Sequence, residues 1–283
     1  MALWAICYPL ISISIAYAPI MLTAFIRAAG AGIFLILVAL IMKRPFPQQK
    51  EHWGFIAVIG LTATGVGFWG MFYAGNLISP GLATVITSTQ PLIACVLGWI
   101  ILKERMGKPA ILGTVLGFFG IIVISAQGLF SWEKQFITGI TYILMAATGI
   151  AVSNIILKKM AAEIDIIYAM GLQLLIGSIP LGIFALNRQA PLSIDWPYIL
   201  IVVSLALPGT AAPFVIWYWL MDKAPLYQLN VYSFLTPVIG LALGILFFAE
   251  SLSLSQWAGI IMIITAIKLV SMNEKSFQDS SIE

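Results

Sequence analysis

The sequence predicts an all-α integral membrane protein with ten transmembrane helices, arranged as two inverted five-helix repeats. Three observations lead to this prediction. Hydrophobic residues make up 61% of the 283 residues and charged residues only 9%, a balance that suits a surface in contact with lipid. Apolar stretches alternate with short polar joints that hold nearly all of the charges. The second part of the chain repeats, in order, prolines, glutamates and glycines of the first.

Each apolar stretch is predicted to cross the membrane once. The hydrocarbon core is about 30 Å thick, so a crossing helix needs about 20 mainly apolar residues. The first stretch is short and has no basic leader, which suggests a trimmed helix rather than a cleaved signal peptide. The predicted spans are residues 2–17, 19–42, 53–74, 80–102, 109–127, 136–157, 166–186, 197–221, 225–248 and 256–271.

The placement of positive charge predicts the orientation. Eleven of the 14 Lys and Arg residues lie in alternate joints or near the C-terminal end, on one side of the predicted membrane. The opposite joints hold only Lys134 and Arg188, and Arg27 lies within a span. Short loops rich in Lys and Arg stay in the cytoplasm. We therefore expect a multi-pass protein of the cell (inner) membrane with both termini in the cytoplasm.

The two copies match in register over their fourth and fifth spans. The matched pairs are Pro91 with Pro237, Gly98 with Gly244, Glu104 with Glu250, and Gly113 with Gly259. Five helices is an odd number, so the second copy would enter the membrane upside down. Inverted repeats of this kind build transporters whose substrate site lies near the membrane midplane. Duplication of a scaffold without transport would leave the same pattern.

These matches divide the chain into three predicted parts. The first half is residues 1–127 and the second half is residues 136–271, each a five-helix repeat. The polar residues 272–283 are predicted to form a disordered cytoplasmic tail.

The combination of features resembles the EamA-type members of the drug/metabolite transporter superfamily. The resemblance rests on the five-plus-five layout, the central prolines Pro91 and Pro237, and the closing glutamates Glu104 and Glu250. The stretch Phe25-Ile26-Arg27 is similar to the family's second-helix motif, and the resemblance covers nearly the whole chain. It implies a secondary transporter, in this family often an exporter of amino acids or other metabolites.

The fourth and ninth spans carry uncharged polar residues just before their central prolines. The candidate substrate-binding residues there are Thr84, Thr87, Ser88, Gln90, Asn230 and Tyr232. A proline removes the donor that would satisfy the carbonyl four residues earlier, and such a carbonyl needs another partner at membrane depth. We expect a cavity lined by these residues, with Pro91 and Pro237 as gates. Alternatively, the hydroxyls bond their own helices and the prolines only set the shape.

Arg27 is the one charged side chain clearly inside a predicted span. Polar groups at this depth are costly unless they face a cavity or a partner. A guanidinium can hold a carboxylate through two parallel hydrogen bonds, so Arg27 is a candidate substrate contact, with a structural anchor as the equal alternative. Asn154 is a weaker candidate that could equally bond one helix to another.

Aromatic residues are the remaining candidates for the substrate site. Trp69 and Tyr73 lie near the end of the third span, and Trp217 and Tyr218 near the end of the eighth. They could form a wall for an amphipathic or aromatic substrate. The alternative is the interfacial belt, where Trp and Tyr gather at helix ends.

Missing residue types limit the chemistry. No Asp or Glu lies in the middle of a span, which argues against a buried carboxylate as a proton relay and favours zwitterionic, anionic or neutral substrates. With one histidine, and with Cys7 and Cys95 inside apolar spans, we expect no metal and no other cofactor. No basic run suits nucleic acid, so we expect no nucleic-acid partner.

The function predicted from these features is secondary transport by alternating access, with export of amino acids or similar metabolites. The partners would be a small-molecule substrate and the lipid bilayer. We expect no enzymatic activity, because a lipid-modifying enzyme would need clustered acids, histidines or a metal. That enzyme and a non-transporting scaffold remain the alternatives. The GxxxG motifs at Gly113–Gly117 and Gly240–Gly244 suit internal packing in a monomer, or else a homodimer.

Overall fold

The computed structural model describes nine stretches of the chain, one of which is a single residue. The described residues are 1–75, 77, 86–87, 89–104, 106–125, 134–160, 163–186, 192–248 and 252–279. Within them helices are the regular secondary structure, joined by short turns and loops, and there is no β-strand. Thr84, Ser88, Arg105, Arg188 and Glu250 lie outside the described residues.

Helices of the first half overlap the first five predicted spans. They are α1 (Ala2–Ser14), α2 (Ile20–Ile41), α3 (Lys50–Ile59), η1 (Gly60–Val66), α4 (Gly67–Ala74), α6 (Gln90–Leu97), η2 (Gly98–Leu102) and α7 (Lys108–Ser125). The segments named η are π-helical turns: η1 lies inside a continuous helix, and η2 ends one. Thus α3, η1 and α4 form one helical stretch, and α6 continues into η2.

Helices of the second half follow the same order. They are α8 (Lys134–Met160), α9 (Ile166–Leu186), α10 (Trp196–Ala206), η4 (Leu207–Ala211), α11 (Ala212–Lys223), α12 (Leu226–Tyr232), α13 (Leu235–Phe248) and α14 (Leu254–Asp279). Again one π-helical turn, η4, interrupts a long stretch, between α10 and α11. Five helical stretches among the described residues are long and apolar enough to cross a membrane, and shorter apolar helices accompany them.

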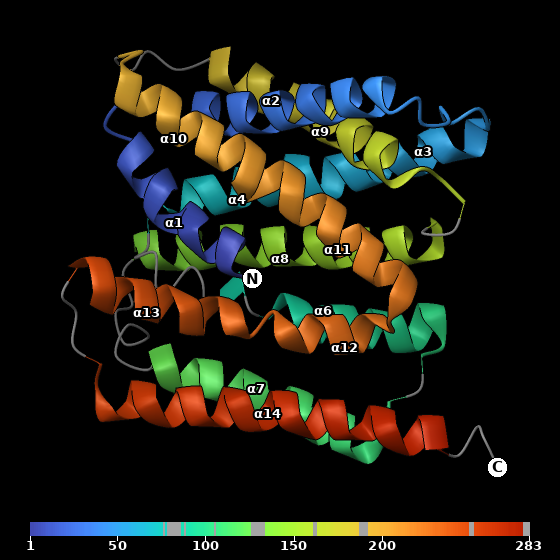
Figure 1. Cartoon of the computed structure of the whole chain (residues 1–283). Helices are drawn as coiled ribbons and strands as arrows, with labels where there is room; N and C mark the ends of the chain where they lie inside the picture. The colour runs from blue at the N-terminus through green and yellow to red at the C-terminus, as the bar shows by residue number, and fades with distance from the viewer. Residues whose placement is uncertain are drawn as a thin grey trace.

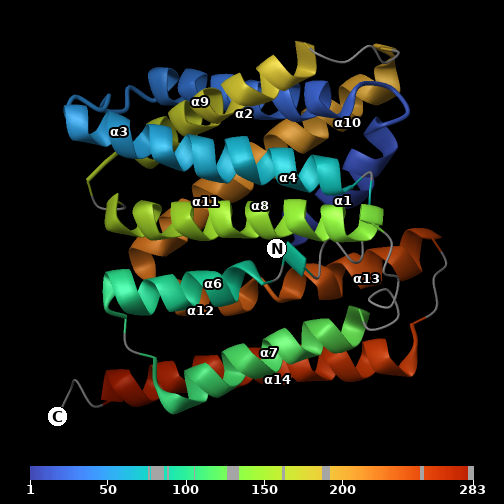
Figure 2. The same ribbon diagram turned by 180° about the vertical axis from the view of Figure 1, so that it is seen from behind.

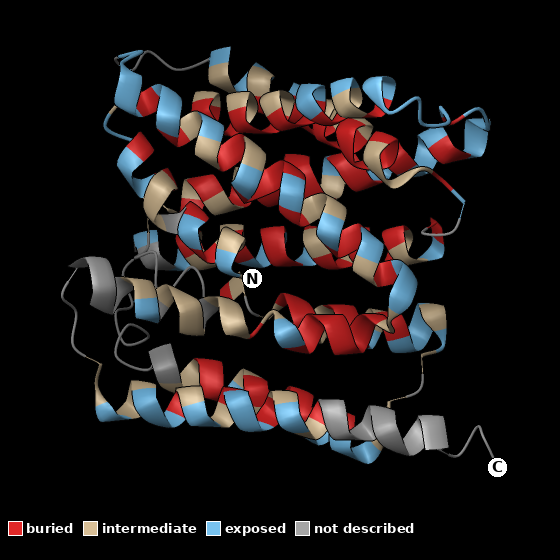
Figure 3. Cartoon of the chain, viewed as in Figure 1, coloured by how far each residue is buried: buried red, intermediate tan, exposed pale blue. Residues whose placement is uncertain are grey.

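Large apolar side chains cover the outward faces of these helices. Ile41, Leu186 and Trp99 are 80%, 87% and 65% exposed. Figure 3 shows exposed residues along the outer helices and buried ones toward the interior of the bundle. Exposed apolar surface of this extent is unstable in water but suits lipid. The protein is therefore a multi-pass membrane protein.

The helices lie side by side, with one antiparallel pair at each end of the stack (Figures 1 and 2). At one end α2 packs on α9, where a Cβ on Gly32 would lie 2.8 Å from Leu175 and a Cβ on Gly182 would lie 3.1 Å from Phe25. Residues near the start of α2 therefore contact residues near the end of α9, so the two helices run antiparallel. Such close approach requires the missing side chain of glycine.

The second antiparallel pair is α7 with α14, at the other end of the stack (Figure 1). A Cβ on Gly113 would lie 2.7 Å from Val270, and a Cβ on Gly120 would lie 2.9 Å from the Gly259 carbonyl. The first GxxxG motif thus serves internal packing. Gly240 of the second motif has open space beside it.

The C-terminal helix is longer than predicted. The sequence places the end of the last span at residue 271 and a disordered tail after it, whereas α14 continues to Asp279. Met272, Glu274 and Lys275 favour the helical state, and each residue added to an existing helix gains a hydrogen bond. The polar composition of this segment therefore does not end the helix.

Candidate functional site

A cavity of about 140 Å³ lies inside the bundle, between residues of the first half and residues of the second. We call it the central cavity. Its described lining residues are Trp4, Cys7, Arg27, Ala63, Phe68, Met71, Thr87, Gln90, Pro91, Ile150, Ser153, Asn154, Leu157, Phe214, Trp217, Ser233 and Thr236. Arg27 is the only charged residue in this set, and the other 16 are apolar or uncharged polar residues.

The lining residues of the two halves correspond in sequence. Twelve of the 17 form six pairs whose members are 146 positions apart, the separation that also relates Pro91 to Pro237. The six pairs are Trp4 with Ile150, Cys7 with Ser153, Phe68 with Phe214, Met71 with Trp217, Thr87 with Ser233, and Gln90 with Thr236. Equivalent positions of the two halves therefore face the same space.

Arg27 is held by a π-helical turn on the opposite half. Its Nε donates to Thr210 Oγ1 at 2.7 Å, and its Nη2 donates to the Gly209 carbonyl at 3.2 Å. Pro213 has no N–H, so it cannot satisfy the Gly209 carbonyl, four residues earlier. That carbonyl instead accepts hydrogen bonds from Arg27 and from Cys7 Sγ, the latter at 3.4 Å. The proline in α11 thus creates the acceptor that orients the guanidinium.

One nitrogen of Arg27 has no partner. The side chain is 2% exposed, and Nη1 is buried with no hydrogen-bond partner among the described residues. Its Cζ lies 4.6 Å from the centre of the Phe68 ring, a cation–π distance. No described carboxylate forms an ion pair with it. The site therefore holds a buried positive charge with one unused donor group.

A second buried pair stands at the equivalent place in the other half. Thr64 Oγ1, in η1, donates to Gln173 Oε1, in α9, at 2.9 Å. Gln173 follows Arg27 by 146 positions, as Thr210 follows Thr64. Gln173 Nε2 is likewise buried without a partner among the described residues. Gln173 does not belong to the cavity lining.

Aromatic side chains form much of the cavity wall. Trp4 meets Trp217 edge to face, with ring centres 5.5 Å apart, and the Phe68 and Phe214 rings are 6.5 Å apart. Trp217 Nε1 donates to Asn154 Oδ1 at 3.2 Å, which fixes the indole. The wall is therefore suited to an apolar or aromatic group beside the charge of Arg27.

Several predicted site residues lie at this cavity. They are Arg27, Thr87, Gln90, Pro91, Asn154 and Trp217. Gln90 Nε2 donates to Asn230 Oδ1 at 3.5 Å, so fully buried Asn230 stands directly behind the wall. Pro237 belongs to α13, one residue after the lining residue Thr236.

The other predicted residues that the structure describes lie elsewhere. Trp69 and Tyr73 contact Tyr142 in a separate aromatic cluster, at 5.0 Å and 5.7 Å between ring centres. Tyr218 is fully buried and donates its hydroxyl to the Met160 carbonyl at 3.1 Å. Tyr232 is 40% exposed and does not line the cavity.

Four lining residues are not among those predicted from the sequence: Trp4, Cys7, Phe68 and Phe214. All four line the cavity; Phe68 lies over the Arg27 guanidinium, and its ring contacts that of Phe214. The separation of 146 positions between the two central prolines could have indicated them. The same separation pairs Phe68 with Phe214 and Cys7 with Ser153.

Polar contacts close the end of the bundle near the joint between α11 and α12. The Glu104 carboxylate accepts from the backbone N–H groups of Leu226 and Tyr227, at 3.0 and 3.4 Å. Lys158 Nζ donates to the Ala224 carbonyl at 2.7 Å and to the Met221 carbonyl. Both charged side chains thus bind backbone groups of the same joint, on the predicted cytoplasmic side.

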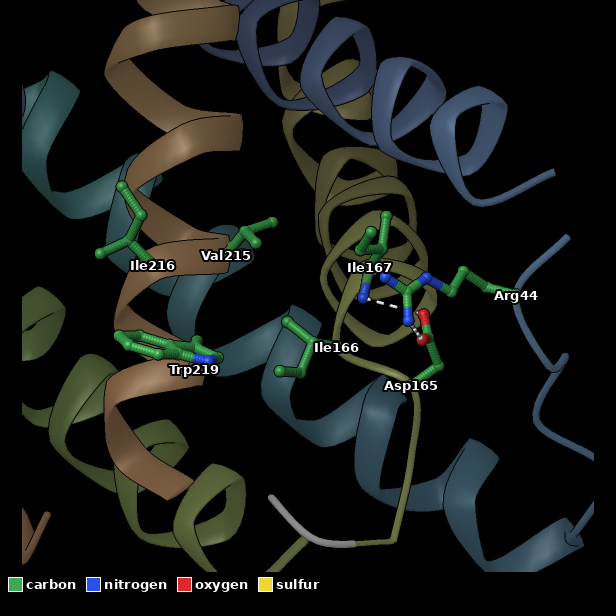
Figure 4. Close-up of a pocket in the computed structure, with 7 residues that line it drawn as sticks. All are labelled: Arg44, Asp165, Ile166, Ile167, Val215, Ile216 and Trp219. Atoms are coloured by element: carbon green, nitrogen blue, oxygen red, sulfur yellow. Dashed lines mark hydrogen bonds and ion pairs between the residues drawn. The ribbon is translucent and has the colours of Figure 1, made fainter. Parts of the chain in front are cut away.

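A second hollow, of about 260 Å³, lies at the start of α9 (Figure 4). Arg44 Nη1 is 3.9 Å from Asp165 Oδ2, while Trp219 and Ile216 of α11 stand on the facing side. The Asp165 carboxylate also accepts from the backbone N–H of Ile167 and so caps α9. This hollow contains no pair of equivalent residues, so the central cavity is the better candidate for the functional site.

Comparison with known proteins identifies transporters. A family described as "EamA-like transporter family" matches residues 1–126 and 137–272. The uncharacterized transporter YvbV of Bacillus subtilis is 30% identical over 99% of this chain and 92% of its own length. A probable amino-acid metabolite efflux pump of Escherichia coli is 27% identical over 84% of this chain and 83% of its own.

A protein of known crystal structure has the same fold. It superposes with a TM-score of 0.81 at 18% identity, over 97% of this chain and 94% of that one. The family match covers both halves, and the named relatives are transporters rather than enzymes. The chain therefore belongs to the EamA-like transporter family of the drug/metabolite transporter superfamily.

Proposed function

We propose that the protein is a secondary transporter that exports small metabolites, amino acids or similar compounds, through the central cavity by alternating access. The pairing of lining residues across the two halves is the observation that carries this proposal. In an inverted-repeat transporter the substrate site lies where the repeats meet, and both repeats contribute equivalent positions to it. The name of the E. coli relative favours amino-acid metabolites as the substrate class and export as the direction.

The antiparallel helix pairs support a five-plus-five inverted arrangement. In this arrangement α9 is the second-half counterpart of α2, and α14 is the counterpart of α7. A twofold axis in the membrane plane brings such counterparts together in opposite directions, and each pair does run antiparallel through glycine contacts. The ten-span topology with cytoplasmic termini, proposed for the inner membrane, follows from this arrangement and the distribution of Lys and Arg.

The cavity also suits alternating access. Its wall includes Pro91, and Thr236 beside Pro237, so both broken helices border the substrate space. We place the gates at these two prolines, because a helix without its regular hydrogen bond bends more readily there. The contacts of Glu104 and Lys158 at the α11–α12 joint would hold the cytoplasmic side closed. The transporter would work as a monomer or a homodimer.

Counterflow in proteoliposomes tests transport directly. Purified protein would be reconstituted into vesicles loaded with unlabelled amino acids, nucleobases or organic acids, and entry of the labelled compound would be followed. We expect labelled compound to accumulate transiently above its outside concentration for at least one class. Absence of counterflow for every class, with folded protein in the vesicles, would contradict the proposal.

A matched pair of variants on α8 tests the central cavity. Ser153 and Thr148 both donate to backbone carbonyls of their own helix, but Ser153 lines the cavity whereas Thr148 faces outward. Ser153→Phe should fill the cavity and reduce transport at least tenfold. Thr148→Phe should transport normally. Equal transport by the two variants, at equal amounts of folded protein, would place the substrate elsewhere.

A further inference from the structure

We propose that the central cavity recognises a single carboxylate attached to an apolar or aromatic body, and that Arg27 Nη1 binds this carboxylate. The inference rests on the proposed function and names its substrate class. Two observations carry it independently of the family: the unused buried donor of Arg27, and the makeup of the wall around it.

The geometry around Arg27 separates its anchoring role from its binding role. Nε and Nη2 are engaged by Thr210 and the Gly209 carbonyl, which hold the guanidinium plane in place. Nη1 is the nitrogen without a partner. A buried charged donor that lacks a partner costs free energy, and an arriving carboxylate oxygen would recover it. Gln173 Nε2 also lacks a partner among the described residues but lies outside the cavity wall, so it is the position of Arg27 at the cavity that makes its unused donor available to a ligand.

The charge of the cavity limits the ligand to a monoanion. Arg27 is the only charged member of the described lining set, so one negative charge balances the site. A phosphate monoester carries close to two negative charges at neutral pH and would leave one of them uncompensated. An amine without a carboxylate would be repelled by the positive charge of Arg27, and the described lining residues include no Asp or Glu to attract it. An ammonium group can accompany the carboxylate but is not required.

The wall beside the charge determines the rest of the ligand. Phe68 lies under the guanidinium, and Phe214, Trp4 and Trp217 continue the aromatic surface. A ligand whose carboxylate reaches Nη1 would therefore place its body against aromatic rings. Apolar and aromatic groups gain from burial there, whereas a hydroxylated body such as a sugar acid would lose hydrogen bonds to water.

The test uses four probes that differ only in their charged groups: phenylalanine, phenylalanine amide, 3-phenylpropionate and phenethylamine. Binding to the purified full chain would be measured by the rise in unfolding temperature with concentration. We expect both acids to bind at least tenfold more tightly than the amide and the amine. Equal binding of the acids and the amide would overturn the inference.

Variants assign the preference to Arg27. Arg27→Gln should weaken binding of the acids by about 10- to 100-fold, the usual worth of a buried hydrogen bond to a charged group, and Arg27→Lys should weaken it less. Gln173→Leu is the matched control, because Gln173 is the equivalent buried residue outside the cavity wall. It should keep the preference for acids. Retention of the preference in Arg27→Gln would overturn the inference.

A measurement on the unaltered protein covers the case in which Arg27→Gln does not fold. Phenylglyoxal modifies arginine side chains, and mass spectrometry can quantify the peptide that contains Arg27. We expect 3-phenylpropionate to protect Arg27 and phenethylamine not to protect it; equal protection by the two would overturn the inference.

Counterflow of the amide but not of the acids would support transport while overturning the carboxylate assignment. Binding of the acids without counterflow of any class of compound would support the carboxylate assignment while overturning transport.

Discussion

Two buried pairs, Arg27 with Thr210 and Gln173 with Thr64, occupy equivalent positions in the two halves but have different surroundings. Arg27 borders the central cavity and lies over the Phe68 ring. Gln173 packs tightly, since a Cβ on Gly60 would collide with its backbone carbonyl. In both pairs a threonine of a π-helical turn is bonded to a long polar side chain. Only one pair carries a charge.

Exchanging the two residues should have the largest effect. The double variant Arg27→Gln, Gln173→Arg moves the charge to a position whose described polar contact is the Thr64 hydroxyl. A buried charge without compensation costs about 3–5 kcal/mol, so the free energy of unfolding should fall by that order. Chemical unfolding in detergent would measure it, with Gln173→Leu as the control. A double variant as stable as the unaltered protein would mean that the two environments are interchangeable.

Removing the threonine partners should give a smaller and unequal loss. Thr210→Val leaves a charged donor of Arg27 unpaired and should cost about 1.5–3 kcal/mol of unfolding free energy. Thr64→Val removes a neutral hydrogen bond inside the membrane and should cost about 0.6 kcal/mol. The two unfolding curves can be compared directly. Equal losses would indicate that the charge of Arg27 adds nothing to its bond with Thr210.

The equivalent phenylalanines should also differ. Phe68 lies 4.6 Å from the Arg27 guanidinium carbon, whereas Phe214 contacts Phe68 and Trp4. Both substitutions to leucine remove a similar ring, but only Phe68→Leu removes the cation–π contact. Because this contact is buried, we expect Phe68→Leu to be the less stable variant by about 2 kcal/mol. A difference of the opposite sign would show that ring packing outweighs the charge.

The paired prolines should affect access rather than stability. Pro91→Ala and Pro237→Ala each restore a backbone donor to one of two equivalent helices. If the halves exchange conformations during transport, the two variants should change cysteine accessibility in opposite senses when labelled from the two sides of the membrane. Single cysteines at residues 103 and 134, in a Cys7→Ser, Cys95→Ser background, would report this. Shifts in the same direction would leave the prolines a purely structural role.

Much of the site could be predicted because prolines and buried polar residues are conspicuous in apolar helices. Arg27, Gln90 and Asn154 stand out for this reason, and all three line the cavity. The aromatic residues could not be chosen in the same way. The sequence predicts Trp69, whereas its neighbour Phe68 lines the cavity. It predicts both Trp217 and Tyr218, of which only Trp217 lines the cavity.

Helix rotation explains these differences. Successive residues of an α-helix are about 100° apart around its axis, so neighbours face different surroundings. A helix that is apolar on all sides gives no pattern from which its rotation can be deduced. The π-helical turns η1 and η4 rotate the following helices further. Prolines mark η4 in the sequence, but no proline marks η1. The helix bounds depend less on rotation, which is why they agree better with prediction.

The position of Cys7 means that the protein contains its own reporter of cavity occupancy. Its thiol lines the cavity 3.5 Å from Arg27 Nη2, whereas Cys95, the only other cysteine of the chain, is buried among Ala110, Ile121 and Tyr227. In a Cys95→Ser protein, the rate at which a small thiol reagent consumes Cys7 would follow the filling and emptying of the cavity. Substrates could then be ranked by the protection they give, without a label on any of them.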